Sequence, residues 1–115
     1  HADILSDLAA ALAGSIGVAP TANLNPERTS PSMFEPIHGS AFDITGKGIA
    51  NPVATFWSAS MMLDHIGETA AATRLMDAIE TITVNKELHT PDLGGTATTD
   101  QVTDAIIDVI RTRND

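Results

Sequence analysis

Residues 35–44 read Glu-Pro-Ile-His-Gly-Ser-Ala-Phe-Asp-Ile, and residues 46–52 read Gly-Lys-Gly-Ile-Ala-Asn-Pro. This segment predicts a loop that leads directly into a helix. Its backbone can approach a ligand closely at Gly39, because glycine has no Cβ. His38 offers a planar ring for stacking or hydrogen bonding, and Asp43 offers a carboxylate suited to a sugar diol. The adenosine half of a dinucleotide needs such groups, although an ordinary hydrogen-bonded surface turn explains His38 and Asp43 equally well.

Composition narrows the class of protein and of partner. The 115 residues suffice for one small domain with one core. The formal net charge of -9 argues against nucleic acid and anionic membranes as partners. The absence of cysteine excludes disulfides and thiol chemistry. No apolar run approaches the ~18 residues that span a bilayer. The chain opens on a polar helical pattern without a basic leader, so we expect a cytoplasmic protein.

Hydrophobic spacing and turn residues predict four helices and one short extended segment. Asn51 is expected to cap the second helix, with Pro52 at its first position and Gly67 at its end. Thr98 and Gln101 form a predicted capping box for the last helix. The expected spans are helices at 3–13, 52–66, 69–86 and from 99 onward, an extended segment at 15–24, and loops at 25–31 and 89–95.

The predicted core lies on one face of each helix. One strand cannot form a sheet alone, so we expect this chain to be a piece of a larger protein. His65 and His89 stand at a helix end and in a loop without evident partners, which favours structural roles. The expected inward residues are Phe56, Ala59, Ser60, Leu63 and Ile66, then Leu75, Ala78, Ile79 and Ile82, and finally Val102, Ala105, Ile106, Val109 and Ile110.

Asp3 and Asp7 lie four residues apart on the first predicted helix, so their carboxylates share a face. Two carboxylates in that arrangement suit Mg²⁺ or Mn²⁺. The alternative is two acids placed favourably near a helix N-terminus, and spacing alone favours that plainer interpretation.

Taken together, these motifs resemble the C-terminal third of the metal-dependent β-decarboxylating dehydrogenases. That family comprises isocitrate, 3-isopropylmalate and tartrate or D-malate dehydrogenases. Residues 1–7 resemble its metal-binding helix, and residues 35–44 and 49–52 resemble its NAD-binding loop. Residues 61–63 and 90–95 also match, so the resemblance covers essentially the whole chain.

The resemblance implies an isocitrate/isopropylmalate dehydrogenase-like α/β fold, here a mostly helical C-terminal fragment with little strand. Residues 1–14 would be the metal-binding helix of the second, dimerisation-side domain. Residues 15–115 would be the C-terminal part of the NAD-binding domain. The complete protein would be a homodimer, and Trp57, Met61 and Met62 would lie in the core or at the subunit interface.

The resemblance also implies NAD-dependent oxidative decarboxylation of a small 2-hydroxy dicarboxylate, with Mg²⁺ or Mn²⁺ acting as a Lewis acid on substrate oxygens. His1-Ala2 before Asp3, residues 21–28 and Phe42 look most like the tartrate and D-malate enzymes, and 3-isopropylmalate or isocitrate remains the alternative. Asp3 and Asp7 would bind the metal. The residues that would bind the cofactor are Glu35, His38, Gly39, Ser40, Ala41, Asp43 and Asn51. The chain has no G-x-G-x-x-G motif, so the NAD assignment comes from the resemblance.

The catalytic residues of the family would lie upstream of this chain, which contains no tyrosine. We therefore expect this fragment alone to be inactive. A hypothesis of another class is a non-catalytic fragment or interaction module, which amphipathic helices and an acidic surface would also suit. The size of the full-length protein separates the two hypotheses, and the specific 2-hydroxy acid depends on residues outside the chain.

Overall fold

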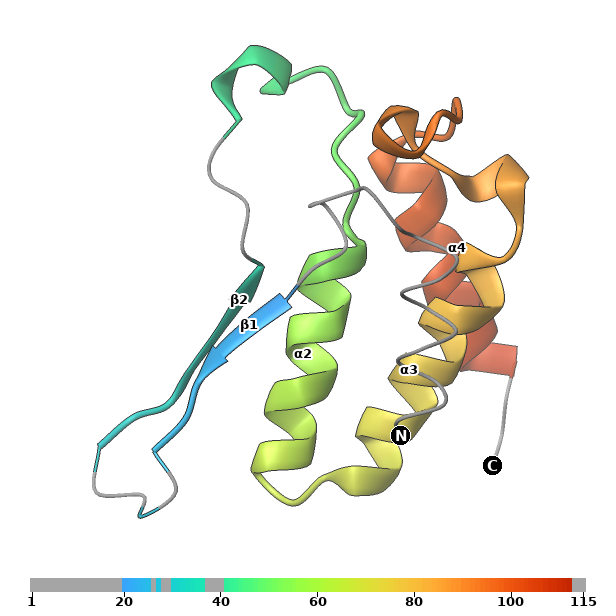
Figure 1. Cartoon of the computed structure of the whole chain (residues 1–115). Coiled ribbons are helices and arrows are strands. Elements are labelled where there is room, and N and C mark those ends of the chain that lie inside the picture. The colour runs from blue at the N-terminus through green and yellow to red at the C-terminus, as the bar shows by residue number, and fades with distance from the viewer. Residues whose placement is uncertain (1–19, 26, 28–29, 37–40, 113–115) are drawn as a thin grey trace.

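The computed structural model describes residues 20–25, 27, 30–36 and 41–112. This part of the chain is mostly helical, as the sequence predicts, and it contains two short strands. Figure 1 shows the elements, which in chain order are β1 (Pro20–Asn23), β2 (Met33–Pro36), the 3₁₀ helix η2 (Phe42–Ile44), α2 (Val53–His65), α3 (Thr69–Thr83), the 3₁₀ helices η3 (Lys86–Leu88) and η4 (Pro91–Leu93), and α4 (Thr99–Thr112).

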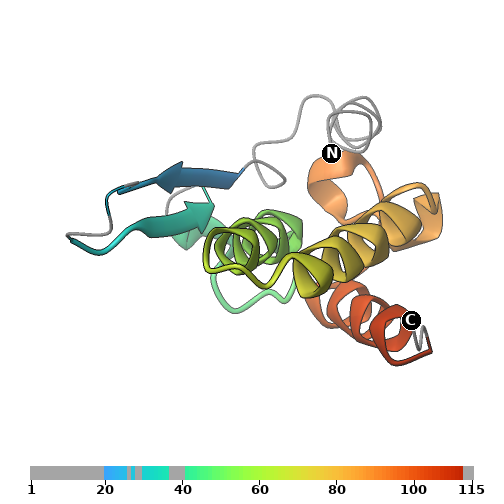
Figure 2. The ribbon, with the colours of Figure 1, turned by 90° about the horizontal axis from the view of Figure 1, so that it is seen from below.

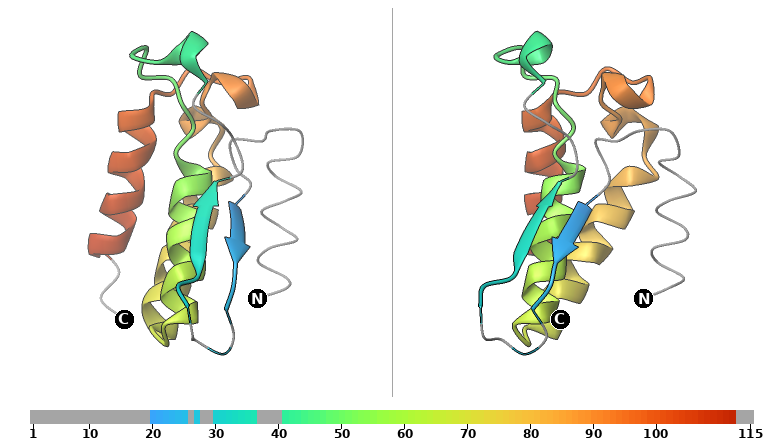
Figure 3. Two further views of the ribbon diagram at one scale, coloured as in Figure 1. Left: turned by 90° about the vertical axis from the view of Figure 1, so that its left-hand side faces the viewer. Right: turned by 60° about the vertical axis from the view of Figure 1, so that its left-hand side comes forward.

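The two strands form an antiparallel hairpin, with Ala22 opposite Phe34. Strand β1 confirms the described part of the predicted extended segment, but β2 was not predicted. The expectation of a lone strand was therefore wrong. Side chains along β2 alternate, with Phe34 and Pro36 half-buried and Met33 and Glu35 exposed. This alternation lets one face of the hairpin pack against α2, as Figure 3 shows.

The hairpin, α2, α3 and α4 are stacked in that order, each in contact with the next, and Figure 2 shows this arrangement from below. Helix α2 ends where Gly67 adopts a left-handed conformation with φ 92°. The Glu68 N–H donates to the Leu63 carbonyl at 2.8 Å, and the Gly67 N–H donates to the Asp64 carbonyl at 3.1 Å. This pair of bonds is a Schellman motif, and it confirms Gly67 as the helix stop.

The capping box of α4 is also confirmed. The Gln101 N–H donates to Thr98 Oγ1 at 3.1 Å, and the Thr98 N–H donates to Gln101 Oε1 at 2.8 Å. The predicted end of the third helix at Lys86 was wrong, because α3 ends at Thr83. Asn85 instead begins η3 by accepting a hydrogen bond from the Glu87 N–H at 3.1 Å.

The core lies between α2, α3 and α4. Of the predicted inward residues, Ser60 and those of α3 are buried, as are Val102 and Ile106, and the others of α2 and α4 are half-buried against the core, apart from Ile66. Ile66 is 56% exposed because it follows the last residue of α2, so the prediction was wrong there. The buried hydrophobic cluster consists of Val53, Leu75, Met76, Ala78, Ile79, Ile82, Ala97, Val102 and Ile106.

Trp57 packs against this core, in agreement with its predicted structural role. Within the described residues, no helix combines the length and hydrophobicity that crossing a bilayer requires.

Candidate functional site

The predicted cofactor residues fall into two groups. Glu35, Ala41, Asp43 and Asn51 belong to the described part of the chain. The other three predicted cofactor residues, and both predicted metal ligands, lie outside the described residues; they are His38, Gly39, Ser40, Asp3 and Asp7. Among the described residues, no group of three or more His, Asp or Glu side chains is arranged to hold a metal ion. The metal prediction therefore remains a prediction.

A short turn presents Asp43 to solvent. Ala41 adopts a left-handed conformation with φ 49° and begins η2. The Ile44 N–H donates to the Ala41 carbonyl at 3.0 Å, and the Lys47 N–H donates to the Ile44 carbonyl at 3.1 Å. Ile44 is half-buried, whereas Asp43 is exposed and Phe42 is 85% exposed. The turn therefore presents a carboxylate next to an exposed aromatic ring, and Figure 1 shows η2 beyond the end of the helical layers.

The start of α4 holds the segment between η2 and α2 through hydrogen bonds from Thr99. The Thr99 N–H donates to the Gly48 carbonyl at 2.9 Å. The Thr99 hydroxyl donates to the Ala50 carbonyl at 2.5 Å. Gly46 and Gly48 both have positive φ, and the space next to their missing Cβ atoms is open. One threonine thus fixes two carbonyls of the segment while its glycines leave the backbone accessible.

Asn51 completes the attachment of this segment. It is only 8% exposed. Its Oδ1 accepts a hydrogen bond from the Val53 N–H at 3.0 Å, and its Nδ2 donates to Asp92 Oδ2 at 3.1 Å. The predicted positions were wrong by one residue, because the helix begins at Val53 and Pro52 takes the N-cap position. The Asn51 side chain nevertheless binds the first N–H of α2.

The structure joins two motifs that sequence reasoning treated separately. Asp92 lies in the predicted loop at 89–95 and accepts hydrogen bonds from Asn51 and from the Thr90 hydroxyl. Asp92, Thr90 and Thr99 were not predicted as site residues. The signal for Asp92 and Thr90 was the Thr-Pro-Asp-Leu-Gly-Gly motif at residues 90–95, which matched the family pattern but had no assigned role. Thr99 stands beside the predicted capping residue Thr98, and no sequence pattern indicated its bonds to Gly48 and Ala50.

Glu35 lies on β2 with an exposed side chain. The strand faces α2 through Phe34 and Pro36, which are half-buried. Because side chains alternate along a strand, Glu35 points away from α2. The structure therefore places Asp43 and Asn51 on one continuous segment, and Glu35 on the strand that precedes it.

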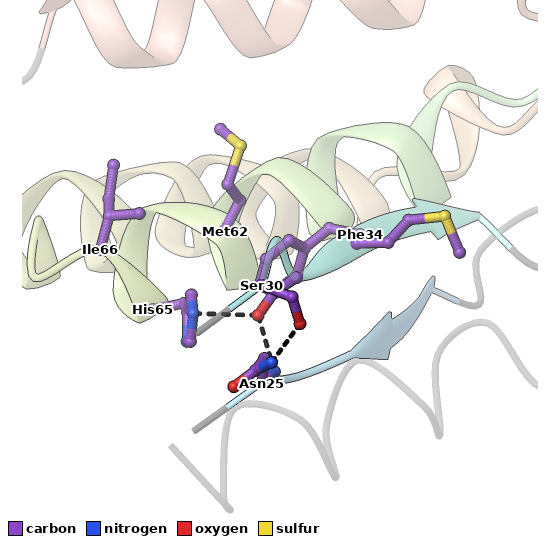
Figure 4. A pocket seen from close by; sticks show the side chains of 8 residues that line it. Asn25, Ser30, Phe34, Met62, His65 and Ile66 are labelled. Carbon is purple, nitrogen blue, oxygen red and sulfur yellow. Dashed lines mark hydrogen bonds between the residues drawn. The ribbon is translucent and has the colours of Figure 1, made fainter. Parts of the chain in front are cut away.

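A separate pocket of about 470 Å³ lies between the hairpin and the C-terminal end of α2. Since α2 has 13 residues, the pocket lies about 20 Å from Asn51 along the axis of that helix. Ser32 Oγ accepts from the Asn25 N–H at 2.7 Å and lies 3.3 Å from His65 Nε2. Figure 4 shows these contacts together with the bond from Asn25 Nδ2 to Ser30 Oγ.

Both histidines that were expected to lack partners have them. His65 contacts Ser32 and also packs its ring against Phe34, with 5.5 Å between ring centroids. His89 donates from Nε2 to the Thr83 carbonyl at 2.7 Å. These contacts join the hairpin to α2 and the η4 loop to the end of α3. The structural roles predicted for the two residues therefore agree with the structure, but the expected lack of partners was wrong.

Comparisons with known proteins agree with the fold and with the motifs. Residues 1–106 match the isocitrate/isopropylmalate dehydrogenase family. A probable tartrate dehydrogenase/decarboxylase of Agrobacterium vitis is 71% identical over 114 residues, which cover 99% of this chain and 32% of that protein. The decarboxylating D-malate dehydrogenase of Escherichia coli is 55% identical over 113 residues, which cover 94% of this chain and 31% of that protein.

Solved structures of β-decarboxylating dehydrogenases have the same fold as this chain over the matched residues. The crystal structure of a beta-decarboxylating dehydrogenase from Thermococcus kodakarensis aligns with a TM-score of 0.77 and 46% identity, and the match covers 95% of this chain and 31% of that one. The chain thus spans about a third of the length of the relatives it matches. The predicted fold class is confirmed, and the chain belongs to the isocitrate/isopropylmalate dehydrogenase family.

Proposed function

We propose that the full-length protein carrying this chain is an NAD- and divalent-metal-dependent dehydrogenase that oxidatively decarboxylates a small 2-hydroxy dicarboxylate, with D-malate or tartrate as the preferred substrate. The observation that carries the proposal is the segment 41–52, which is anchored at Gly48, Ala50 and Asn51 while Asp43 remains exposed. The identity of 71% to a probable tartrate dehydrogenase/decarboxylase supports this substrate class.

The described residues fit the adenosine half of NAD. The exposed Asp43 carboxylate can accept hydrogen bonds from both ribose hydroxyls. Open space beside Gly46 and Gly48 admits a ligand close to the backbone. A 2′-phosphate would meet the Asp43 carboxylate, and such like-charge contacts cost several kcal/mol. In our proposal, the site therefore selects NAD over NADP.

The proposed metal ligands are Asp3 and Asp7, whose spacing places two carboxylates on one helix face. Carboxylate oxygens are the ligands that Mg²⁺ and Mn²⁺ prefer. A divalent cation, when bound, supplies Lewis-acid stabilisation for negative charge that develops on substrate oxygens. The proposal assigns residues 1–14 to the second domain and residues 15–115 to the NAD-binding domain of a cytoplasmic homodimer.

The proton-transfer and carboxylate-binding groups of the reaction are expected in the rest of the full-length protein. In our proposal, the role of this chain is to orient the cofactor through Asp43 and Asn51 and to contribute two metal ligands.

The proposal is tested by following NADH absorbance with the purified full-length protein. The substrates are D-malate, tartrate, 3-isopropylmalate and isocitrate, each with NAD⁺ and Mn²⁺. We expect turnover of D-malate or tartrate to exceed that of the other two and to stop when EDTA removes the metal. A clear preference for 3-isopropylmalate or isocitrate would reverse the substrate assignment. Absence of NADH formation with all four would favour a non-catalytic interaction module.

A further inference from the structure

Asp92 occupies a position that links two segments distant in sequence. It lies in η4 and accepts a hydrogen bond from Asn51, which is 41 residues away. It also accepts a hydrogen bond from the hydroxyl of Thr90, which is only 1% exposed. Asp92 is itself exposed, and its two carboxylate oxygens are used separately: Oδ1 accepts from buried Thr90 and Oδ2 accepts from Asn51.

The contacts of Asn51 define which way its amide points. Only the amide oxygen can accept the hydrogen bond from the Val53 N–H, so the nitrogen is directed toward Asp92. A carboxylate acceptor makes this bond stronger than a bond between neutral groups. Asp92 therefore selects one rotamer of Asn51, and that rotamer satisfies an N–H in the first turn of α2 that no helix carbonyl can reach.

The anchoring of segment 41–52 involves its main chain as well as the side chain of Asn51. Thr99 fixes the backbone just before Asn51 through Gly48 and Ala50. The segment is thus anchored by α4 on its main chain and by η4 on the side chain of Asn51, and both anchors come from the region of residues 90–99.

We propose that Asp92 is a positioning residue for the cofactor site: it holds Asn51, and through it the junction between segment 41–52 and α2, in the geometry that binds NAD. Asp92 acts without touching the cofactor. This inference rests on the proposed function, because it assumes that segment 41–52 binds NAD.

The test uses the full-length protein and NADH as the probe. We expect Asp92→Ala to raise the Kd for NADH and the KM for NAD⁺ about tenfold, the size expected from a lost charge-assisted hydrogen bond. We expect kcat at saturating NAD⁺ to change by less than about twofold. The lost contact weakens cofactor binding equally in the ground state and in the transition state, so the barrier of the bound complex stays the same. Glu87→Ala is the matched control, since Glu87 is an exposed acid in the neighbouring η3.

A charge-preserving exchange keeps the test informative if Asp92→Ala does not fold. In the double variant Asn51→Asp/Asp92→Asn, the new carboxylate can still accept from the Val53 N–H, and the new amide can donate to it and accept from Thr90. We expect hydrogen exchange at the Val53 amide to be much faster in Asn51→Asp, where two carboxylates face each other, than in the wild type, and to return to within about threefold of it in the double variant.

The outcomes separate a failure of the proposed function from a failure of the positioning role of Asp92. Wild-type protein that does not bind NADH contradicts the proposed function, while hydrogen exchange at Val53 still tests the contact itself. Wild-type binding with the same Kd in Asp92→Ala and Glu87→Ala overturns the positioning role of Asp92, even if Asp92→Ala is less stable. A double variant with Val53 exchange as fast as in Asn51→Asp overturns it as well.

Discussion

Adjacent glycines at positions 94 and 95 should respond very differently to alanine. A Cβ added to Gly95 would lie 2.6 Å from the carbonyl carbon of His89 and 2.7 Å from its Cβ, with the carbonyl oxygen closer still. These are mostly backbone atoms, which cannot rotate away. A Cβ added to Gly94 meets open space, although its φ of 84° is unfavourable for alanine.

The magnitude of the Gly95→Ala effect follows from what holds His89. Its carbonyl accepts a hydrogen bond from the buried Ala97 N–H at 2.9 Å, and its ring donates to the Thr83 carbonyl at 2.7 Å. Overpacking a rigid site costs about 1–3 kcal/mol, and leaving a buried N–H unpaired costs about 1–3 kcal/mol. We therefore expect Gly95→Ala to lower the free energy of unfolding by about 3 kcal/mol or more. Gly94→Ala should lower it by about 1–2 kcal/mol.

Equilibrium urea unfolding of the full-length protein measures both variants against the wild type. The thermal midpoint of each variant provides a second measurement. Because residues 89–97 carry Asp92, Gly95→Ala should also weaken NADH binding. A Gly95→Ala variant that is as stable as the wild type, or more stable than Gly94→Ala, would refute the reasoning.

Three further predictions concern the metal, the core and the isolated chain. Asp7→Asn should raise the Mn²⁺ concentration required for half-maximal activity at least about tenfold without unfolding the protein, and an unchanged Mn²⁺ titration would exclude Asp7 as a ligand. Ile106→Ala should cost about 2–5 kcal/mol, because Ile106 is 0% exposed. The neighbouring Ile107→Ala should cost much less, and similar urea midpoints for the two variants would contradict the packing. The 115-residue chain alone should produce no NADH from D-malate, NAD⁺ and Mn²⁺ and should self-associate, because Met33, Met62 and other apolar side chains are exposed; turnover, or a monomer with a sharp two-state transition, would contradict this.

Local signals made most helices predictable from the sequence. Gly67 and the Thr98–Gln101 pair act within one helical turn, so their residue types were sufficient to place the end of α2 and the start of α4. The predicted end of α3 at Lys86 was wrong, because α3 ends at Thr83 and Asn85 begins a separate 3₁₀ helix. Val84 is exposed, so extending α3 through it would bury no further apolar side chain.

Features that depend on distant partners were not predictable in the same way. Strand β2 has only four residues, and its existence depends on pairing with β1 and packing on α2. The sequence predicted a role for Asn51 at the start of α2, one residue away from its actual position, but its bond to Asp92 joins residues 41 positions apart, and no local pattern encodes that contact. The motif at residues 90–95 was visible in the sequence, whereas its role in anchoring segment 41–52 required the fold.

In the proposed function, segment 41–52 binds the adenosine half of NAD through Asp43. Isothermal titration of NAD⁺ and NADP⁺ into the full-length protein tests it directly, with Asp43→Asn as the variant. Asp104→Asn is the matched control, because Asp104 is an exposed aspartate on α4. We expect NAD⁺ to bind wild type and Asp104→Asn at least about 100-fold more tightly than NADP⁺, because the 2′-phosphate meets a carboxylate. Asp43→Asn should narrow that ratio to about tenfold or less. Equal affinities for the two cofactors in the wild type, or an unchanged ratio in Asp43→Asn, would contradict the claim.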